Sequence, residues 1–385
     1  MAQPAVSIAA EPDARPASRW IIGARADLLW LMLPVLSGYL CLYVSVGLGV
    51  SSLLIWWFWN LFFNGPHFYA TLSRTYLDKQ EWQQRGSLLI GSLALVLVGP
   101  LAIWLSVRTA SRVPFLGFWF FGVLWAYYHV VRQHYGFMAL YQKKNGERAG
   151  SDNALDFWIF HVLMFGPVVS WLLRYPELRE AAGLSFRLST VESAVVAATP
   201  LVVALTIGLY VVKEALIYRH RGTINWPKSL LLLAYVPLHL LLLLRPTVAG
   251  RYDILLFNAV VTLPHNFQYV AIVWFYNVNR YRPDRERRQY GWASVASSSV
   301  LRFAALGVLY SAIFFYLRWY LEGQAVPFSF GPSRWSDLGL GGSFKIADLA
   351  AAVWIGFVFH HQYLDQRIWK IHSDRQLSRD LLLVA

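Results

Sequence analysis

Cysteine and charge are both scarce in this sequence. Cys41 is the only cysteine among 385 residues, which excludes a scaffold held by intramolecular disulfide bonds. Charged residues make up 14% of the chain and hydrophobic residues 57%, whereas a soluble protein has about 25% charged residues. A soluble chain of this length would need more charge to cover its surface. The composition therefore predicts an all-α, polytopic transmembrane helix bundle, because helices are the usual way for a chain to cross lipid.

Motifs of several soluble enzyme classes are absent as well. The sequence has no Gly-rich phosphate loop, no G-x-S-x-G motif and no C-x-x-C motif, so nucleotide-driven, serine-hydrolase and thioredoxin-like functions have no support. Basic residues outnumber acidic ones by 34 to 21, for a net charge of +13, but they lie between the apolar runs rather than in one patch. We therefore expect the lipid bilayer as a partner, and no nucleic acid.

Apolar segments of about 20 residues are long enough to cross the hydrocarbon core as helices. We expect a polar cytoplasmic tail at 1–26, a multi-span membrane domain at 27–370 and a cytoplasmic C-terminal tail at 371–385. The first two spans are joined so closely that one of them can be re-entrant, and the seventh is short and contains Pro237 and His239. The ten expected spans are 27–49, 51–73, 87–107, 115–141, 154–173, 190–218, 228–245, 252–278, 294–320 and 345–369.

The loops between these spans differ in charge. With ten spans, Lys and Arg are roughly twice as frequent on the side that carries both termini as on the opposite side. Cytoplasmic loops are the ones enriched in basic residues. The bias therefore predicts that both termini lie in the cytoplasm, in a multi-pass protein of the bacterial inner (plasma) membrane.

Histidine gives the strongest functional signal. Of the ten histidines, His220 and His372 fall in basic segments, where we expect solvent-exposed side chains. His239 lies in the short seventh span and does not share the depth of the other seven. The other seven histidines lie in the cytoplasmic half of five expected spans. At 1.5 Å per residue, His67, His134, His161, His360 and His361 lie roughly 9–14 Å from the cytoplasmic ends of their helices, and His129 and His265 lie deeper. Ionisable groups inside membrane helices are costly and usually functional. We therefore expect one metal site held by His67, His129, His134, His161, His265, His360 and His361.

Polar residues close to these histidines complete the candidate site. Asp365 follows His361 by four residues, so the carboxylate shares its helix face and can bind a metal or orient an imidazole. Arg132 follows His129 by three residues and is, with Asp365, a candidate catalytic residue. Asn266 and Gln268 are candidates for hydrogen bonds that fix the rings of ligating histidines.

The spacing of His129 and His134 leaves two arrangements open. The two residues lie about 140° apart around a helix and cannot both point at one ion. Either they flank a site with two ions, or one of them does not bind the ion and instead supports a residue that does. Imidazole suits iron, copper, zinc and nickel. We expect non-haem iron with one or two ions, and haem, copper and zinc are alternatives.

Two families resemble this pattern. The His129–His134 spacing and the adjacent His360–His361 pair resemble the boxes of membrane-bound non-haem iron desaturases, hydroxylases and alkane monooxygenases, although the sequence has no H-x-x-H-H box and more spans. The dispersed intramembrane histidines are also similar to those of bacterial carotene-cleaving dioxygenases. The His-rich motifs together suggest a bacterial polytopic membrane family. The resemblance implies an iron centre.

Three functions remain open from the sequence. The first is a membrane metalloenzyme, a non-haem iron oxygenase that hydroxylates, desaturates or oxidatively cleaves a hydrophobic small molecule, with an electron donor on the cytoplasmic face. The second is a haem-binding or quinone-linked electron-transfer protein, for which fewer histidines would suffice. The third is a transporter of a metal or small solute, which should show polar residues in both halves of the membrane. The concentration of histidine in one half favours the first.

The predicted topology can be tested by cysteine labelling. Single cysteines introduced within 143–151 and within 325–340 should lie on opposite sides of the membrane, because five spans separate these loops. A membrane-impermeant maleimide should label the second group in intact cells and the first only after permeabilisation. Labelling of both groups from one side would overturn the topology and the depth of the histidines.

Overall fold

The chain folds into a helical bundle. The computed structural model describes residues 19–147, 151–175, 179, 185, 187–245, 253–281, 289–321, 344–370 and 374–381. Within these ranges it has no β-strand, only an isolated bridge between Asp78 and Gly291. The all-α fold expected from the composition is confirmed.

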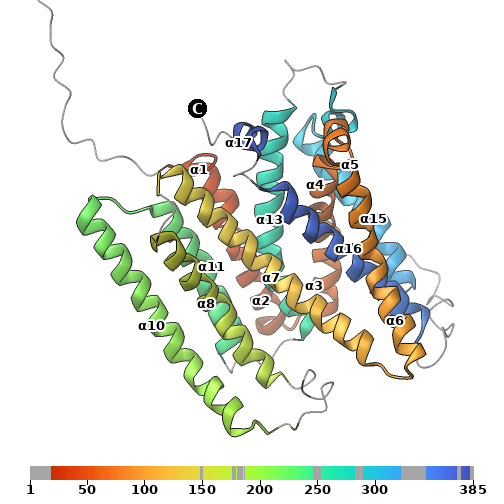
Figure 1. The fold of residues 1–385 in the computed structure, drawn as a ribbon, viewed down its shortest axis with the longest axis horizontal. Helices are drawn as coiled ribbons and strands as arrows, with labels where there is room; N and C mark the ends of the chain where they lie inside the picture. The colour runs from red at the N-terminus through yellow and green to blue at the C-terminus, as the bar shows by residue number, and fades with distance from the viewer. Residues whose placement is uncertain are drawn as a thin grey trace, which may run out of the picture.

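Helix α13 lies at the centre of the bundle (Figure 1). It contacts the N-terminal helices and also α7, which runs diagonally across the molecule and joins its two sides. The central elements are α2 (Val35–Leu42), α3 (Ser52–Trp59), α4 (Gly65–Arg74), α7 (Val113–Lys144) and α13 (Ile254–Arg280).

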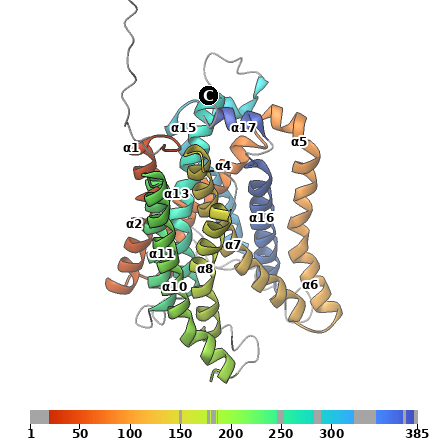
Figure 2. The ribbon, with the colours of Figure 1, turned by 60° about the vertical axis from the view of Figure 1, so that its left-hand side comes forward.

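Two groups of helices flank this centre, as the views in Figures 1 and 2 show. On one side α8 packs against α10 and α11, with α10 outermost. On the other side α16 packs against α6, and α15 packs against α4. The flanking helices are α5 (Lys79–Ser92), α6 (Val98–Arg108), α8 (Ser151–Arg174), α10 (Thr190–Arg221), α11 (Trp226–Leu244), α15 (Val300–Leu321) and α16 (Ile346–Ile368).

The outer surface of these helices is apolar. On α10, for example, Leu201 and Leu205 are 62% and 65% exposed, which would be unfavourable in water but suits lipid. Seven helical segments are long and apolar enough to cross a membrane, and together they indicate a multi-pass membrane protein. They are Ala24–Gly47, Lys79–Arg108, Val113–Lys144, Asn153–Arg174, Thr190–Arg221, Trp226–Leu244 and Val300–Leu317.

The other three expected spans, 51–73, 252–278 and 345–369, are helical but are not among these seven. They are the segments that carry His67, His265 and His361. Polar side chains lower the hydropathy of these helices, yet the side chains themselves are buried against neighbouring helices. The count of about ten spans and the cytoplasmic placement of both termini stay predictions.

The described parts of the terminal segments pack onto the bundle. Residues 1–18, 371–373 and 382–385, and His372 with them, lie outside the described residues. At the N-terminal end, Asp27 accepts hydrogen bonds from the backbone N–H of Ile21 (2.7 Å) and Ile22 (2.9 Å). At the C-terminal end, the short helix α17 (Arg375–Asp380) contacts α13, where Asn279 donates to the carbonyl of Asp380.

A wide helical turn precedes His67. Between α3 and α4 the helix opens into a π-helical stretch, η3 (Asn60–Asn64), a local geometry that is frequent at functional sites. The next residue, Gly65, lies so close to α15 that a Cβ atom there would come within 2.1 Å of the Ser311 Cβ. Ser311 also donates to the carbonyl of Asn60 (2.7 Å). These contacts fix the rotation and position of α4, and therefore the direction of His67.

A proline has a similar role ahead of His265. Pro264 lies inside α13 and has no N–H to donate to the carbonyl of Val260, one turn earlier. Gly38 of α2 approaches this carbonyl, because a Cβ at Gly38 would lie 2.9 Å from the Val260 oxygen. The absence of a side chain lets α2 and α13 pack closely, as small residues do in membrane helices.

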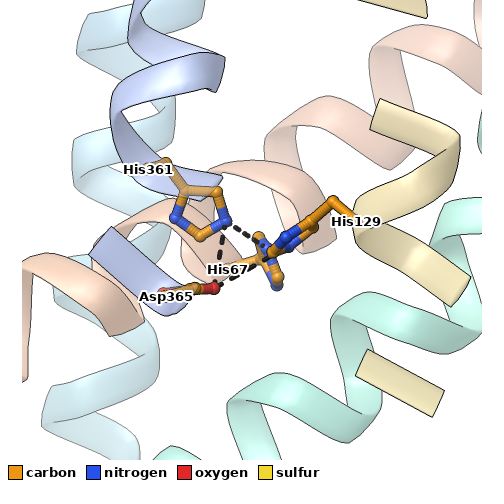
Figure 3. Close-up of side chains that lie close together, drawn as sticks. All are labelled: His67, His129, His361 and Asp365. Carbon is orange, nitrogen blue, oxygen red and sulfur yellow. Dashed lines mark hydrogen bonds and ion pairs between the residues drawn. The ribbon is translucent and has the colours of Figure 1, made fainter. Parts of the chain in front are cut away.

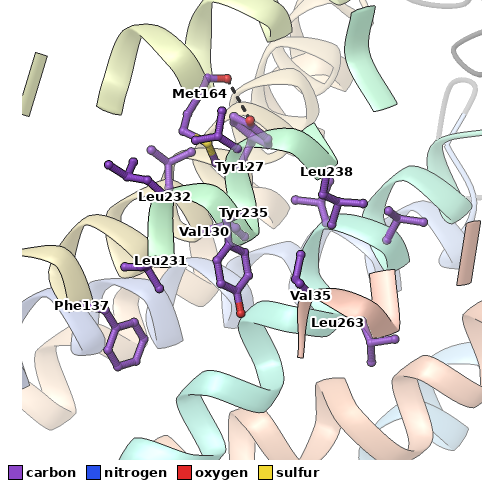
Figure 4. Packing of buried hydrophobic residues seen from close by; sticks show 14 of the residues in the cluster. Val35, Tyr127, Val130, Phe137, Met164, Leu231, Leu232, Tyr235, Leu238 and Leu263 are labelled. Carbon is purple, nitrogen blue, oxygen red and sulfur yellow. Dashed lines mark hydrogen bonds between the residues drawn. The ribbon is translucent and has the colours of Figure 1, made fainter. Parts of the chain in front are cut away.

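A large apolar cluster between α7, α8 and α11 holds the middle of α7 in place (Figure 4). Val130 and Val131 are 2% and 0% exposed, and Tyr127 donates to the carbonyl of Met164 on α8 (2.9 Å). His129 lies between these anchored residues. Its position therefore depends on contacts made by the residues just before and just after it on α7.

Candidate metal centre

Four buried side chains from three helices meet at one point in the bundle (Figure 3). His67 comes from α4, His129 from α7, and His361 and Asp365 from α16. Each offers one ligand atom, and these atoms all lie within 4.8 Å of one another. We call these four residues the cluster. It is the one group of this kind among the described residues.

The distances within the cluster suit a single ion. The Nε2 atoms of His67 and His361 are 2.7 Å apart. Asp365 Oδ2 lies 3.5 Å from His361 Nε2 and 3.8 Å from His129 Nε2. Ligand atoms that bind one ion at about 2.0–2.2 Å lie roughly 3–3.5 Å from one another. Small side-chain adjustments would bring all four into that range.

The hydroxyl of Thr71 connects two members of the cluster. Thr71 Oγ1 lies 2.9 Å from His361 Nδ1, 2.9 Å from Asp365 Oδ1 and 2.6 Å from the hydroxyl of Tyr269. Tyr269 also donates to Asp365 Oδ1, at 2.6 Å. When Thr71 donates to the carboxylate, its oxygen accepts from Nδ1–H of His361. This pattern leaves His361 Nε2 with a free lone pair, as a metal ligand requires.

Three atoms of the cluster residues have no hydrogen-bond partner: His67 Nδ1, His129 Nε2 and Asp365 Oδ2. His129 Nε2 and Asp365 Oδ2 are buried and unpaired, and both face the centre of the cluster (Figure 3). Buried polar atoms without a partner are rare and call for an explanation. A metal ion at the centre would bind both. Three imidazole nitrogens and one carboxylate oxygen fit iron, copper, zinc or nickel, and the cluster alone does not determine which.

His265 lies directly beside the cluster. Its ring centre is 4.7 Å from that of His67 and 5.1 Å from that of His129. Its Nδ1 is buried without a partner. His265 packs against two ligand rings but does not belong to the group whose ligand atoms meet within 4.8 Å.

His134 lies one step further from the centre, with its ring 6.4 Å from that of His265. Its Nδ1 is 2.9 Å from the Gln268 side-chain oxygen, while the Gln268 amide donates to the carbonyl of Leu31 at 2.6 Å. Gln268 thus bonds to an imidazole, but to that of His134, which lies outside the cluster. His239, which fitted no layer in the sequence, lies beside His134 at 6.3 Å between ring centres.

The remaining candidates make contacts elsewhere. Asn266 bonds to the carbonyl of Thr262 and the indole N–H of Trp59, not to an imidazole. Arg132 lies over the ring of Tyr135, 5.3 Å from its centre, and faces a cleft described below.

The structure does not bring His161 and His360 into the cluster. His161 Nδ1 lies 2.7 Å from the carbonyl of Phe157, one turn away on its own helix. His360 Nε2 lies 2.8 Å from the hydroxyl of Tyr76, which in turn donates to the carbonyl of Leu89. Adjacent helical residues point about 100° apart, so His360 and His361 cannot both face the centre. His220 is exposed near the end of α10.

Sequence reasoning missed two residues that organise the cluster. Thr71 follows His67 by four residues and Tyr269 follows His265 by four, so each shares a helix face with a candidate histidine. The same spacing singled out Asp365 after His361. Applied to every histidine, this rule would have found Thr71 and Tyr269.

A cleft of about 630 Å³ extends from the cluster between α7, α13 and α16. His129 and Asp365 are among its lining residues, as are Arg132, Tyr269 and Trp369. Its volume lies in the range of small-molecule sites, about 300–1,000 Å³. The cleft can therefore bring a ligand to the cluster.

Comparison of the chain with protein-family models, with curated proteins and with solved structures gives no match. The resemblance to iron desaturases and carotene-cleaving dioxygenases is not confirmed. What stands is a helical, membrane-type bundle with a buried His/Asp cluster that could hold a metal ion.

Alanine substitutions distinguish the cluster from the other histidines. His67→Ala, His129→Ala, His361→Ala and Asp365→Ala should each remove most of the bound metal, because each removes one of the four ligand atoms. His161→Ala, His360→Ala and His220→Ala should retain it. Iron, copper and zinc are quantified in detergent-purified protein. Equal loss in His360→Ala and His361→Ala would contradict this assignment.

Removing the Thr71 hydroxyl should weaken metal binding without removing a ligand. Thr71→Val deprives His361 of the acceptor that fixes its ring, and such losses typically cost about 10–100-fold in metal affinity. Thr71→Ser should keep most of the affinity. Affinity is measured by competition with a chelator, and Thr206→Val on α10, which loses only a bond to the carbonyl of Val202, is the control. Unchanged affinity in Thr71→Val would show that this bond does not orient His361.

Proposed function

We propose that this protein is an integral membrane metalloenzyme, a mononuclear non-haem iron oxygenase that acts on a lipid-soluble substrate. The observation that carries the proposal is the convergence of three buried imidazoles and one carboxylate, two of which, His129 and Asp365, line a cleft. Histidines combined with one carboxylate, with coordination positions left open, are typical of non-haem iron(II) oxygenases. Iron in this site would supply the dioxygen activation that hydroxylation, desaturation or oxidative cleavage needs.

The residues of the chain have distinct proposed roles. His67, His129, His361 and Asp365 hold the ion, and Thr71 and Tyr269 keep the Asp365 carboxylate in place through its other oxygen. His265 packs against two of the ligand rings and limits their rotation. His134 lies next to His265, with 6.4 Å between the ring centres. All four ligand side chains are buried, which limits the contact of the ion with water and so its side reactions.

The close contact of His67 and His361 disfavours a haem site. Two axial nitrogens on opposite sides of a haem iron lie about 4 Å apart, twice a usual metal–nitrogen distance. The two Nε2 atoms here are 2.7 Å apart, and His129 and Asp365 face the same centre. A macrocycle between the two rings would displace all four side chains.

The proposed enzyme would lie in the inner membrane of a bacterium and take electrons from a donor at its cytoplasmic face. The basic loops support cytoplasmic termini and the inner membrane of a bacterium. Hydroxylation or desaturation with dioxygen consumes two electrons beyond those of the substrate, so we expect an electron donor on the cytoplasmic face. The cluster lies in the half of the bundle nearest that face in the predicted topology.

Two measurements test the oxygenase proposal. Iron(II)-loaded protein should give a high-spin iron–nitrosyl signal in EPR when nitric oxide is added, because the four protein ligands leave coordination positions open. Membranes that contain the protein, incubated under oxygen-18 gas, should accumulate a lipid with added oxygen-18 or with two fewer hydrogens.

The matched variants sharpen this test. Asp365→Ala should abolish both signals, and His360→Ala, one residue from the cluster but outside it, should retain both. An iron centre that never binds nitric oxide, or lipid profiles that are the same for the wild type and Asp365→Ala, would refute the oxygenase.

A further inference from the structure

The cleft beside the cluster combines cationic and aromatic side chains. Its lining includes the basic residues Arg132, Lys143 and Lys370, whereas Asp365 is its one acidic residue. One Asp365 oxygen is held by Thr71 and Tyr269 and the other faces the cluster. The part of the cleft outside the cluster is therefore positively charged.

The position of Arg132 relates this charge to the cluster. Arg132 lies one helical turn after His129 on α7, about 5 Å along the helix axis. Among the described residues it makes no ion pair with a carboxylate, and its contact is the ring of Tyr135. A half-buried guanidinium in this setting favours an anionic ligand, which it can bind through two parallel N–H groups.

Lys143 reinforces the charge toward the outer end of the cleft. It follows Arg132 by 11 residues on α7, which is close to three full turns, so both side chains lie on nearly the same face. Lys143 is exposed at the rim. Lining residues of one sign attract a ligand of the opposite sign and raise its local concentration.

The cleft also offers apolar contact. Tyr128, Phe137 and Trp369 line it together with Ile272 and Leu140. Such walls suit a hydrocarbon chain and not a small hydrophilic ion. A ligand that satisfies both features has one anionic group and an apolar remainder.

We infer that the substrate of the proposed oxygenase, on which this inference rests, is an amphiphile with a phosphate or carboxylate head group that binds Arg132. The apolar part then lies along the aromatic wall, and the bond that reacts lies near the head group. This excludes neutral hydrocarbons as the preferred substrate class.

Binding of dodecyl compounds tests the charge preference. The full-length protein, in phosphatidylcholine nanodiscs, should bind radiolabelled dodecyl phosphate at least about tenfold more tightly than dodecanol or dodecyltrimethylammonium, since a charge-assisted hydrogen bond is worth a factor of that order. Dodecanoate should compete with dodecyl phosphate, and inorganic phosphate should compete only weakly. Binding to empty nanodiscs is subtracted.

Variants identify the group responsible. Arg132→Gln should lower dodecyl phosphate affinity about tenfold and leave dodecanol affinity unchanged, and Arg132→Lys should restore part of the preference. Arg108→Gln, an exposed arginine at the end of α6, should have no effect. Equal affinity for dodecanol and dodecyl phosphate, or no change in Arg132→Gln, would overturn the inference. Equal affinity for inorganic phosphate and dodecyl phosphate would show that the apolar chain does not contribute to binding, and would overturn the inference of an amphiphilic substrate.

A distance measurement separates this inference from the proposed function. With Mn²⁺ in the cluster, the phosphorus NMR signal of bound dodecyl phosphate should broaden strongly, because one helical turn places the phosphate within about 10 Å of the ion. With Zn²⁺ it should stay sharp. A preference for anions that persists in metal-free protein and in Asp365→Ala supports the inference even where the cluster binds no metal. Metal binding without broadening would show that the anion binds elsewhere.

Discussion

One hydroxyl group connects the parts of the candidate metal centre. Thr71 Oγ1 on α4 contacts His361 and Asp365 on α16 and Tyr269 on α13, all between 2.6 and 2.9 Å. Through these bonds it joins three helices at the level of the cluster and sets which nitrogen of His361 is free to bind. The Thr71 proton goes to Asp365 and the Thr71 oxygen accepts from His361. The hydroxyl is therefore satisfied as donor and as acceptor, which matters because a partly satisfied buried network is costly.

The cost of placing polar groups within a membrane explains the layout of the bundle. Three expected spans are not apolar enough to count among the seven membrane-spanning candidates. They contain α4 and α16, which carry cluster residues, and α13, which carries the neighbouring His265. More apolar helices pack against two of them: α15 contacts α4 and α16, and α6 contacts α16. The third ligand helix, α7, is itself one of the seven candidates, but its His129 is buried, in keeping with the rule that intramembrane ionisable residues face the bundle interior.

Much of this arrangement could be predicted from the sequence, but only the position of each residue along its helix and not the direction in which its side chain points. Composition predicted a helical membrane bundle, and histidine depth selected all three cluster histidines. Depth carries no information on direction around the helix, so His161 and His360 were selected as well, although they bond to Phe157 and Tyr76. Rotation about a helix axis is set by contacts between residues distant in sequence, and a single sequence does not display these.

Glycine contacts show what fixes those rotations. Gly65 lets α4 approach Ser311 on α15, and Gly99 lets α6 approach the carbonyl of Ala352 on α16. Neither glycine touches the cluster, yet each positions a helix that supplies a ligand or supports one that does. Because the four ligand atoms come from three separately anchored helices, an ion that binds all of them also favours the packed arrangement of those helices over any looser one. Metal binding and helix packing are then coupled by the same contacts, and a substitution at a remote glycine acts on the centre through the distance between helices.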